Sequence, residues 1–297
     1  MTTADSASQS SRIACEQGTV TTADGLSLAT RCWVPLNARG TVTLVHGLAE
    51  HSGRYEPLAQ ALATRGWAVF AADLRAHGLS QDPPGAGRVH VDHFEDYFLD
   101  LDAISGIART QFEALPHFLL GHSMGGLITL RYVLHKPEGL SGAIVSSPAL
   151  GIHPDSLPPG PLRALTGLLS RLAPRFRVDG GLDSNAVSRD PDVVRDYVND
   201  PLVTTKVSVR WYSEFVQAIE RAHQAAPSLR IPLLLMQSGA DRLVDPGGPR
   251  KWLNQAPEGQ VEFHVWEGLY HEMFNEPEKQ QVRSMVLDWL ERQPGNR

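Results

Sequence analysis

The sequence predicts an α/β fold: a mostly parallel central sheet with helices on both faces, an N-terminal antiparallel hairpin and a helical cap insertion. Three observations predict this fold. Short apolar runs rich in β-forming residues alternate with stretches of helical periodicity. A segment in which apolar and polar residues alternate precedes them. The succession of strand and helix patterns then stops between residues 148 and 229.

The first expected element is a hairpin over residues 18–34, in which apolar and polar residues alternate on either side of Asp24-Gly25. Asp-Gly is a strong signal for a tight turn between antiparallel strands. Residues 1–17 are rich in Ser, Thr and Ala and are predicted to form a disordered tail. Cys15 and Cys32 flank the turn. A bridge between them is sterically conceivable, but two reduced thiols are expected.

The central sheet is predicted from six apolar runs separated by helical patterns. Runs that are apolar throughout indicate parallel strands covered on both faces, and in such sheets the reactive groups collect at the carboxyl ends of the strands. The runs are 41–46, 67–73, 117–122, 141–147, 232–238 and 261–266. Helices are expected at 56–65, 94–114, 123–136, 249–256 and 277–292.

The segment from 148 to 229 breaks this succession. It opens with the Pro- and Gly-rich LGIHPDSLPPGP and continues with helical patterns but no convincing strand. We therefore expect a helical cap, or lid, inserted into a core formed by residues 18–147 and 230–297.

Composition and charge exclude several function classes. Apolar residues make up 42% and charged residues 20% of the chain, as in ordinary globular proteins. The formal net charge of −6 provides no basic surface for nucleic acid, so nucleic acid is not an expected partner. The N-terminus has neither a basic region nor an apolar core of a secretory signal, and a cytoplasmic protein is expected. The sequence leaves the oligomeric state open.

The candidate nucleophile is Ser123, in the pattern Gly121-His122-Ser123-Met124-Gly125. This G-x-S-x-G pattern lies between the run HFLLG and the helical pattern LITLRYVLH. A sharp strand-to-helix turn exposes a serine Oγ, and glycines are needed where a Cβ would collide with neighbouring backbone. The context makes a chance glycine-rich turn the weaker interpretation.

A serine hydroxyl needs a base to accept its proton and a carboxylate to orient that base, in the chain order Ser, Asp or Glu, His. Asp241 follows the run PLLLMQS directly, and His271 lies in a loop before the last helix. Asp245 is the rival carboxylate, although its place before Pro246 suits a cap of the following helix. His264 is the rival base, but it lies in the middle of a predicted strand.

An oxyanion hole needs two backbone N–H groups, one after the nucleophile and one from the loop after the first parallel strand. By position these are the N–H groups of Met124 and Leu48. The predicted chemistry needs no cofactor and no metal. His90, Asp92 and His93 form only an isolated cluster, without a second set at ligand spacing.

The chain resembles the monoacylglycerol lipase and lysophospholipase branch of the α/β-hydrolases over residues 18–292. The resemblance rests on five motifs, of which the first is the most specific. They are HGLAEHSGRY at 46–55, GHSMGG at 121–126, DYVNDPL at 196–202, GADRLV at 239–244 and YHE at 270–272.

The resemblance implies a serine hydrolase that cleaves an ester of one long acyl chain and a small polar alcohol, monoacylglycerols first among them. Glu50, Arg54 and Tyr197 match positions near the alcohol end of the substrate in that family. His122 matches a position that shapes the turn at the nucleophile. Lysophospholipase and broad-specificity carboxylesterase activities share the same triad and stay as alternatives, as does a ligand receptor on this fold. A peptidase would need an acidic site for a substrate amine.

The cap contains a basic amphipathic segment at 162–177. Leu162, Leu165, Leu168, Leu169 and Leu172 recur at helical spacing, with Arg163, Arg171, Arg175 and Arg177 between and after them. Such a helix either buries its apolar stripe against its own domain or lies in a lipid interface. Peripheral membrane contact through this segment is therefore a hypothesis.

Overall fold

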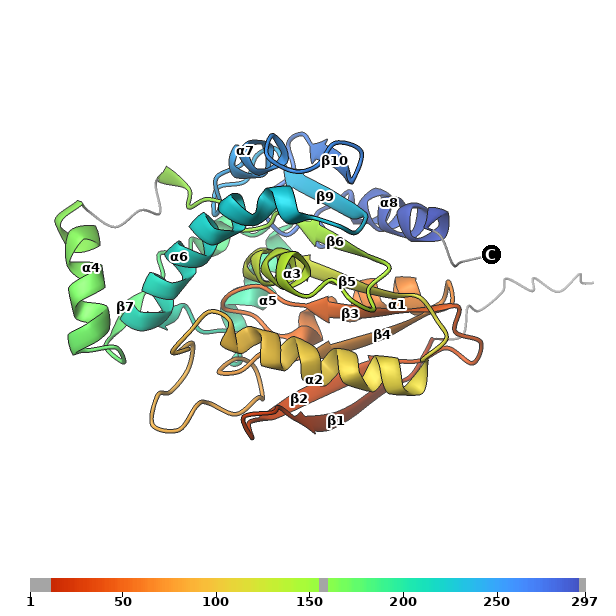
Figure 1. Cartoon of the computed structure of the whole chain (residues 1–297), viewed down its shortest axis with the longest axis horizontal. Helices are drawn as coiled ribbons and strands as arrows, with labels where there is room; N and C mark the ends of the chain where they lie inside the picture. The colour runs from red at the N-terminus through yellow and green to blue at the C-terminus, as the bar shows by residue number, and fades with distance from the viewer. Residues whose placement is uncertain (1–11, 155–159, 294–297) are drawn as a thin grey trace, which may run out of the picture.

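The computed structural model describes residues 12–154 and 160–293, without the side chains of 160–165. Its central sheet has eight strands in the order β1-β2-β4-β3-β5-β6-β9-β10 (Figure 1). All neighbours from β4 to β10 are parallel, and the pairs β1·β2 and β2·β4 are antiparallel. The predicted fold class is confirmed. The strands are β1 (Cys15–Thr21), β2 (Ser27–Trp33), β3 (Gly40–Val45), β4 (Trp67–Ala72), β5 (His117–His122), β6 (Gly142–Ser146), β9 (Leu233–Ser238) and β10 (Val261–Trp266).

Helices cover both faces of this sheet because the buried strands are apolar on both sides. Leu119 of β5 belongs to one core cluster, whereas Phe118 and Leu120 on the same strand belong to the other. The first cluster takes in side chains of α2 (Asp96–Gln111), α3 (Met124–His135) and α7 (Gly248–Leu253). The second takes in α1 (Glu56–Ala63) and α8 (Lys279–Arg292).

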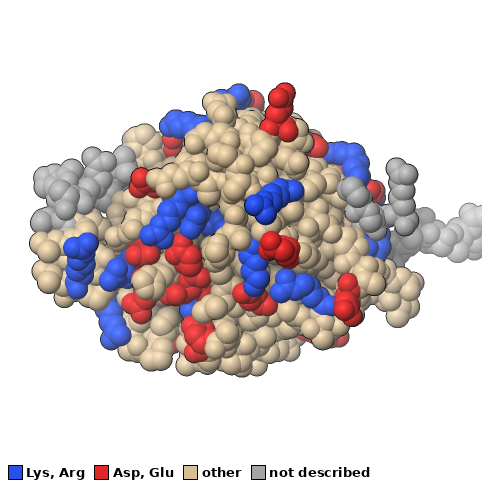
Figure 2. Space-filling model, in the orientation of Figure 1, with Lys and Arg blue, Asp and Glu red and all other residues tan. Residues whose placement is uncertain are grey.

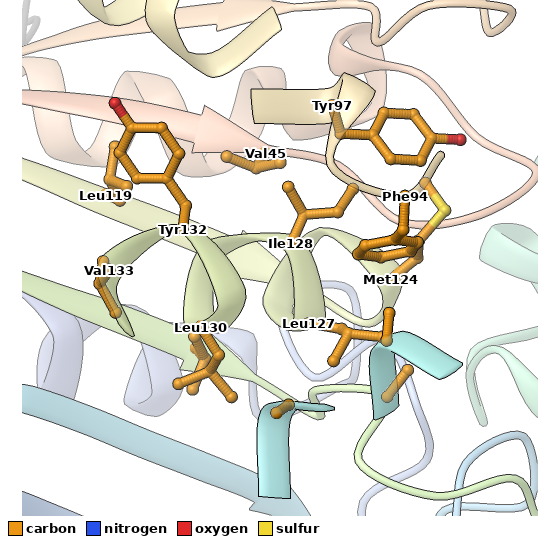
Figure 3. Close-up of a cluster of buried hydrophobic side chains, with 14 of the residues drawn as sticks. Val45, Phe94, Tyr97, Leu119, Met124, Leu127, Ile128, Leu130, Tyr132 and Val133 are labelled. Carbon is orange, nitrogen blue, oxygen red and sulfur yellow. The ribbon is translucent and has the colours of Figure 1, made fainter. Parts of the chain in front are cut away.

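Helix α3, which follows the candidate nucleophile directly, has most of its residues buried. Figure 3 shows Met124, Leu127 and Ile128 of α3 in one cluster with Val45 of β3 and Phe94. All five side chains are almost completely buried. A helix packed in this way cannot shift its first turn without opening the core, so the residue that precedes it is held firmly.

The segment between β6 and β9 departs from the purely helical insertion that the sequence predicts. Arg177–Asp179 (β7) and Lys206–Ser208 (β8) form a two-stranded antiparallel sheet, so the expectation of no strand is wrong. Each strand has three residues, too few for a periodic pattern. The helices are α4 (Gly160–Leu172), α5 (Pro191–Asn199) and α6 (Val209–Ala225), with 3-10 turns η3 (Ser184–Ala186) and η4 (Ala226–Ser228). Figure 1 shows α4 and β7 at one end of the molecule.

The N-terminal hairpin corrects the predicted end of the tail. Strand β1 begins at Cys15, within the expected tail of residues 1–17, and residues 1–11 lie outside the described part of the chain. Both cysteines are free. The register pairs Cys15 with Trp33 and Glu16 with Cys32. Because directly paired residues share a face and neighbours alternate, the two thiols project from opposite faces of the hairpin.

The surface carries both signs of charge. On the face drawn in Figure 2, Lys and Arg side chains are interspersed with Asp and Glu side chains. This mixture agrees with the net charge of −6 and provides no single basic face there for a polyanion. Among the helices of the described residues, none is both long and apolar enough to cross a membrane.

Candidate active site

Ser123 stands at a strained turn between β5 and α3. Its backbone has φ +56° and ψ −120°, a conformation that costs a non-glycine residue free energy. Its N–H donates to Ser146 O on the neighbouring strand, and its own carbonyl accepts from Leu127 and Ala149. The surrounding hydrogen bonds thus hold the turn in a conformation that presents the Oγ at the carboxyl end of the sheet.

The glycines around Ser123 are required by close backbone contacts. A Cβ at Gly125 would lie well inside van der Waals distance of the carbonyl oxygens of Val45 and His46. A Cβ at Gly121 would meet the carbonyl oxygen of Gly125 in the same way. The turn therefore forms only because both positions lack a side chain.

We expect Gly125→Ala to lower the free energy of unfolding by about 1–3 kcal/mol, the usual effect of overpacking a filled core. Activity per folded molecule should fall as well, because Ser123 and β3 must move apart. Gly106→Ala is the matched control: Gly106 lies inside α2 with open space around it, so an alanine there should stabilise by about 0.5–1 kcal/mol. Urea denaturation of both variants tests this difference; a Gly125→Ala variant as stable as the parent would contradict it.

The structure brings Ser123, Asp241 and His271 together from the ends of three strands. His271 Nε2 lies 2.8 Å from Ser123 Oγ, and His271 Nδ1 lies 2.7 Å from Asp241 Oδ2. All three side chains are buried. A base within hydrogen-bond distance of a hydroxyl, itself oriented by a carboxylate, is the arrangement that activates a serine.

The environment of His271 favours its role as a base. Burial lowers the pKa of its imidazole, but the charge and hydrogen bond of Asp241 outweigh burial and hold the pKa above the usual value. Asp241 is fixed in turn, because its Oδ1 accepts from the N–H groups of Leu243 at 2.9 Å and Val244 at 3.1 Å. The other oxygen, Oδ2, binds the imidazole and accepts a longer hydrogen bond from Gln237 Nε2 at 3.4 Å.

The alternative carboxylate, Asp245, and the alternative base, His264, lie outside this hydrogen-bonded group. Asp245 accepts from Gly247 N–H at 2.8 Å and pairs with Lys251 at 3.0 Å, so it shapes the approach to α7. The N-cap residue of α7 is Gly247, so the expectation that Asp245 caps this helix is wrong. Asp245 instead accepts from Gly247 N–H in the turn before the helix. His264 lies within β10, as the sequence predicts, and its ring contacts Trp266.

The loop after β3 lies directly against Ser123. A Cβ on Gly47 would be 3.1 Å from the Ser123 Cβ, and Gly47 N–H donates to the carboxylate of Glu50. Leu48 and Met124 line the same pocket as Ser123. The two residues expected to supply oxyanion N–H groups thus border the same pocket as the nucleophile.

A buried cluster of charges borders the pocket. Glu50 accepts from Tyr55 OH at 2.7 Å, and Arg54 lies 3.5 Å from Glu50 and 2.7 Å from Glu272. Arg54 also stacks over the ring of Tyr197, 4.8 Å from its centre. Burial and the neighbouring Glu272 carboxylate raise the pKa of Glu50 to about 7. Glu50, Tyr197 and Glu272 line the pocket.

His122 completes the group of expected site residues. Its Nδ1 lies 3.2 Å from Ser146 Oγ, and its ring centre is 4.8 Å from that of His271. Burial and the nearby His271 hold the pKa of His122 well below the usual value, so the ring is neutral at physiological pH. A neutral polar ring therefore lies beside the candidate base.

The rest of the pocket wall is largely apolar. Trp211, Tyr212 and Phe215 of α6 contribute to it, together with Ile152 and Val244, which form a β-bridge. The pocket thus joins an apolar wall from the inserted segment to a polar cluster at the core. Within the described residues, no group of three or more His, Cys, Asp and Glu side chains could hold a metal ion.

Sequence reasoning did not assign a role to Glu272. Glu272 belongs to the YHE motif at 270–272, which marks it as a residue of the site. Its partner Arg54, however, lies 218 residues away along the chain. No local pattern connects two residues at such a separation. The ion pair could be found only from the structure.

Comparison with known proteins shows the family of the chain. The family model described as "Serine aminopeptidase, S33" matches residues 37–278. A "Monoacylglycerol lipase" of Mycolicibacterium smegmatis is 37% identical, over 90% of this chain and 93% of the relative. "Phospholipase YtpA" of Bacillus subtilis is 40% identical, over 81% and 91%.

A solved structure leads to the same family. The crystal structure of a monoacylglycerol lipase from Paleococcus ferrophilus is 34% identical, with a TM-score of 0.79 over 89% of this chain and 98% of that one. The resemblance inferred from the motifs is thus confirmed. The chain belongs to the serine aminopeptidase S33 family of α/β-hydrolases, among the relatives of monoacylglycerol lipases, and is a serine ester hydrolase.

Proposed function

We propose that this protein hydrolyses monoacylglycerols to a fatty acid and glycerol, with Ser123, His271 and Asp241 as catalytic triad. The observation that carries the proposal is the continuous hydrogen-bond chain from Asp241 through His271 to Ser123 Oγ, at 2.7 and 2.8 Å. Lengths in this range allow proton transfer without a prior rearrangement.

In the first half of the cycle, Ser123 Oγ attacks the ester carbonyl carbon while His271 Nε2 accepts its proton. The carbonyl oxygen becomes an oxyanion that the N–H groups of Leu48 and Met124 stabilise, helped by the N-terminus of α3. His271 then gives the proton to the glycerol oxygen as the C–O bond breaks. The products are free glycerol and an acyl ester of Ser123.

In the second half, water attacks the acyl carbon while His271 accepts one of its protons. The tetrahedral intermediate collapses, the proton returns to Ser123 Oγ and the fatty acid leaves. Asp241 stabilises the imidazolium that forms in both halves and does not itself need to take up the proton.

The pocket wall supports a lipid ester with a small alcohol. The side chains of Trp211, Tyr212 and Phe215 fit an acyl chain, which needs apolar surface and no hydrogen bonds. Glu50 and Tyr197 provide acceptor and donor groups suited to glycerol hydroxyls. We propose that residues 148–229 act as the cap that supplies the apolar part.

The rate at which carboxylic acid is released from monoacylglycerols of different chain length, measured beside diacylglycerol, lysophospholipid and short synthetic esters, tests this substrate. The proposal predicts the highest kcat/KM for a monoacylglycerol. Cleavage of short esters alone would retain the serine hydrolase and reject the lipid substrate. A preference for lysophospholipid would instead favour the second candidate function, lysophospholipase, which the relative named as a phospholipase supports.

Other uses of the same triad have less support. A peptidase needs free carboxylates for a substrate amine, whereas the Glu50 and Glu272 carboxylates both lie in the cluster around Arg54. A broad-specificity carboxylesterase would hydrolyse the ester substrates named above with similar kcat/KM. A receptor would bind the lipid with slow turnover and change its affinity for a partner protein.

We also propose peripheral membrane contact through the end of α4 and the residues after it. Leu168, Leu172 and Phe176 follow each other at four-residue spacing and are 54, 75 and 60% exposed. Arg171 and Arg175 lie between them and are exposed. The predicted stripe is thus not wholly buried against α6, although α4 packs on that helix. The side chains of Leu162, Arg163 and Leu165 lie outside the described ones.

Leu172→Ser is expected to weaken binding to anionic phosphatidylglycerol vesicles at low salt by about tenfold, because it removes one inserting apolar side chain. Leu36→Ser provides the matched control, since Leu36 is 97% exposed but lies outside this segment. Vesicle sedimentation measures both. The membrane contact would be rejected if the two variants lost vesicle binding equally. It would also be rejected if the parent protein did not sediment with the vesicles.

A further inference from the structure

The loop that carries His271 is tied to the insertion on both sides of the histidine. Tyr270 N–H donates to Glu276 Oε2 at 3.1 Å, and Glu272 N–H donates to Val187 O at 2.8 Å. Val187 belongs to the inserted segment, between η3 and α5. The backbone amides that flank His271 are therefore held by Glu276 on one side and directly by the insertion on the other.

Glu276 is itself bound mainly by the insertion. Its buried carboxylate accepts from Ser188 Oγ at 2.7 Å, from Arg189 N–H at 2.6 Å and from Arg189 Nε at 2.5 Å, in addition to Tyr270. A buried carboxylate is costly unless such donors surround it. Burial raises the pKa of Glu276, but Arg189 and Ser188 outweigh burial and hold it below the usual value.

The geometry points to a clamp, made of Glu276, Ser188 and Arg189, that positions His271 between Asp241 and Ser123 while the insertion is docked on the core. This inference rests on the catalytic roles proposed above. Glu276 touches none of the reacting atoms and acts through the backbone of Tyr270, so it is a positioning residue. Misplacement of a catalytic group by about 1 Å can cost about 100-fold in rate.

The clamp has a consequence that loss of stability alone would not produce. The groups whose charges act on His271 include the carboxylates of Asp241, Glu272 and Glu50, of which Asp241 raises its pKa most; His122 beside it is neutral. If the loop loosens, His271 moves away from Asp241 and its pKa falls. The acid limb of the activity profile then shifts to lower pH. A partly unfolded sample has fewer active sites but the same pH midpoint.

The experiment compares Glu276→Gln and Arg189→Met with a matched control, Glu278→Gln. Glu278 also pairs with Arg189, but at the surface, and its substitution changes the charge by the same amount. Arg189 is 35% exposed, so Arg189→Met spares the core if Glu276→Gln folds poorly. The kcat and KM for p-nitrophenyl butyrate are measured from pH 5 to 9 per active serine, counted with a fluorophosphonate.

We expect Glu276→Gln to lower kcat by about 10- to 100-fold with KM within twofold, and to move the acid limb to lower pH. Arg189→Met should do the same to a smaller extent, and Glu278→Gln should match the parent. Parental kcat and pH midpoint per active serine in both clamp variants would overturn the clamp while leaving the triad in place. If the fluorophosphonate does not label Ser123 in the parent, the proposed function fails and the clamp fails with it.

Discussion

Ser123→Ala is expected to lower the rate of ester hydrolysis by about 10⁴- to 10⁶-fold, the largest effect of any single substitution in this chain. The hydroxyl is the only group removed, and no other group that lines the pocket replaces its attack on the carbonyl carbon. KM should change little, because the pocket wall stays in place. Steady-state kinetics on a monoacylglycerol and on p-nitrophenyl butyrate measure the effect.

Ser105→Ala separates this loss from the removal of a buried hydroxyl. Ser105 is buried in α2 and donates to Thr43 Oγ1 at 3.3 Å, away from the pocket. Its substitution should cost about 1 kcal/mol of stability and leave kcat unchanged. A Ser123→Ala variant that keeps more than a few per cent of the parental rate, with normal folding, would contradict the assignment of the nucleophile.

Asp241→Asn is expected to lower kcat by about 10⁴-fold near neutral pH, because an amide no longer holds His271 in the productive tautomer. The pH profile should change as well. In the parent, activity rises with pH as His271 loses its proton, at a midpoint above the ordinary imidazole value since Asp241 raises its pKa. Without that charge, the remaining acid limb should lie at lower pH.

Asp245→Asn is the matched control for this substitution. It makes the same chemical change four residues further along, where the carboxylate binds Gly247 and Lys251. We expect parental kcat and an unchanged pH profile. If instead Asp245→Asn abolished activity and Asp241→Asn did not, the roles of the two carboxylates would have to be exchanged.

The sequence predicts the elements whose pattern is local. Runs of four apolar residues, FLLG in β5 and LLLM in β9, have no stable place except the inside of a sheet covered on both faces. The turn at Ser123 is predictable for a similar reason, because steric contacts at Gly121 and Gly125 leave few other sequences possible. Local sterics and periodicity therefore determine the core and the order of the site residues.

Features that depend on distant partners were not predictable. Strands β7 and β8 pair across the insertion, and each is too short for a periodic signal. The ion pairs Arg54–Glu272 and Arg189–Glu276 join residues 218 and 87 positions apart. Apart from Arg54, which matches a family position, these residues look like ordinary surface charges in the sequence. The fold alone brings each pair together, and burial of the Glu272 and Glu276 carboxylates strengthens their influence on the site.

Covalent labelling tests the central claim, that Ser123 is the nucleophile of this hydrolase, most directly. The protein is treated with a fluorophosphonate, and peptide mass spectrometry locates the adduct while residual ester hydrolysis is followed in the same sample. We predict one phosphonate, on Ser123, with activity lost in proportion to labelling and with much slower labelling of Asp241→Asn. An adduct on another residue, or full activity after complete labelling of Ser123, would contradict the account.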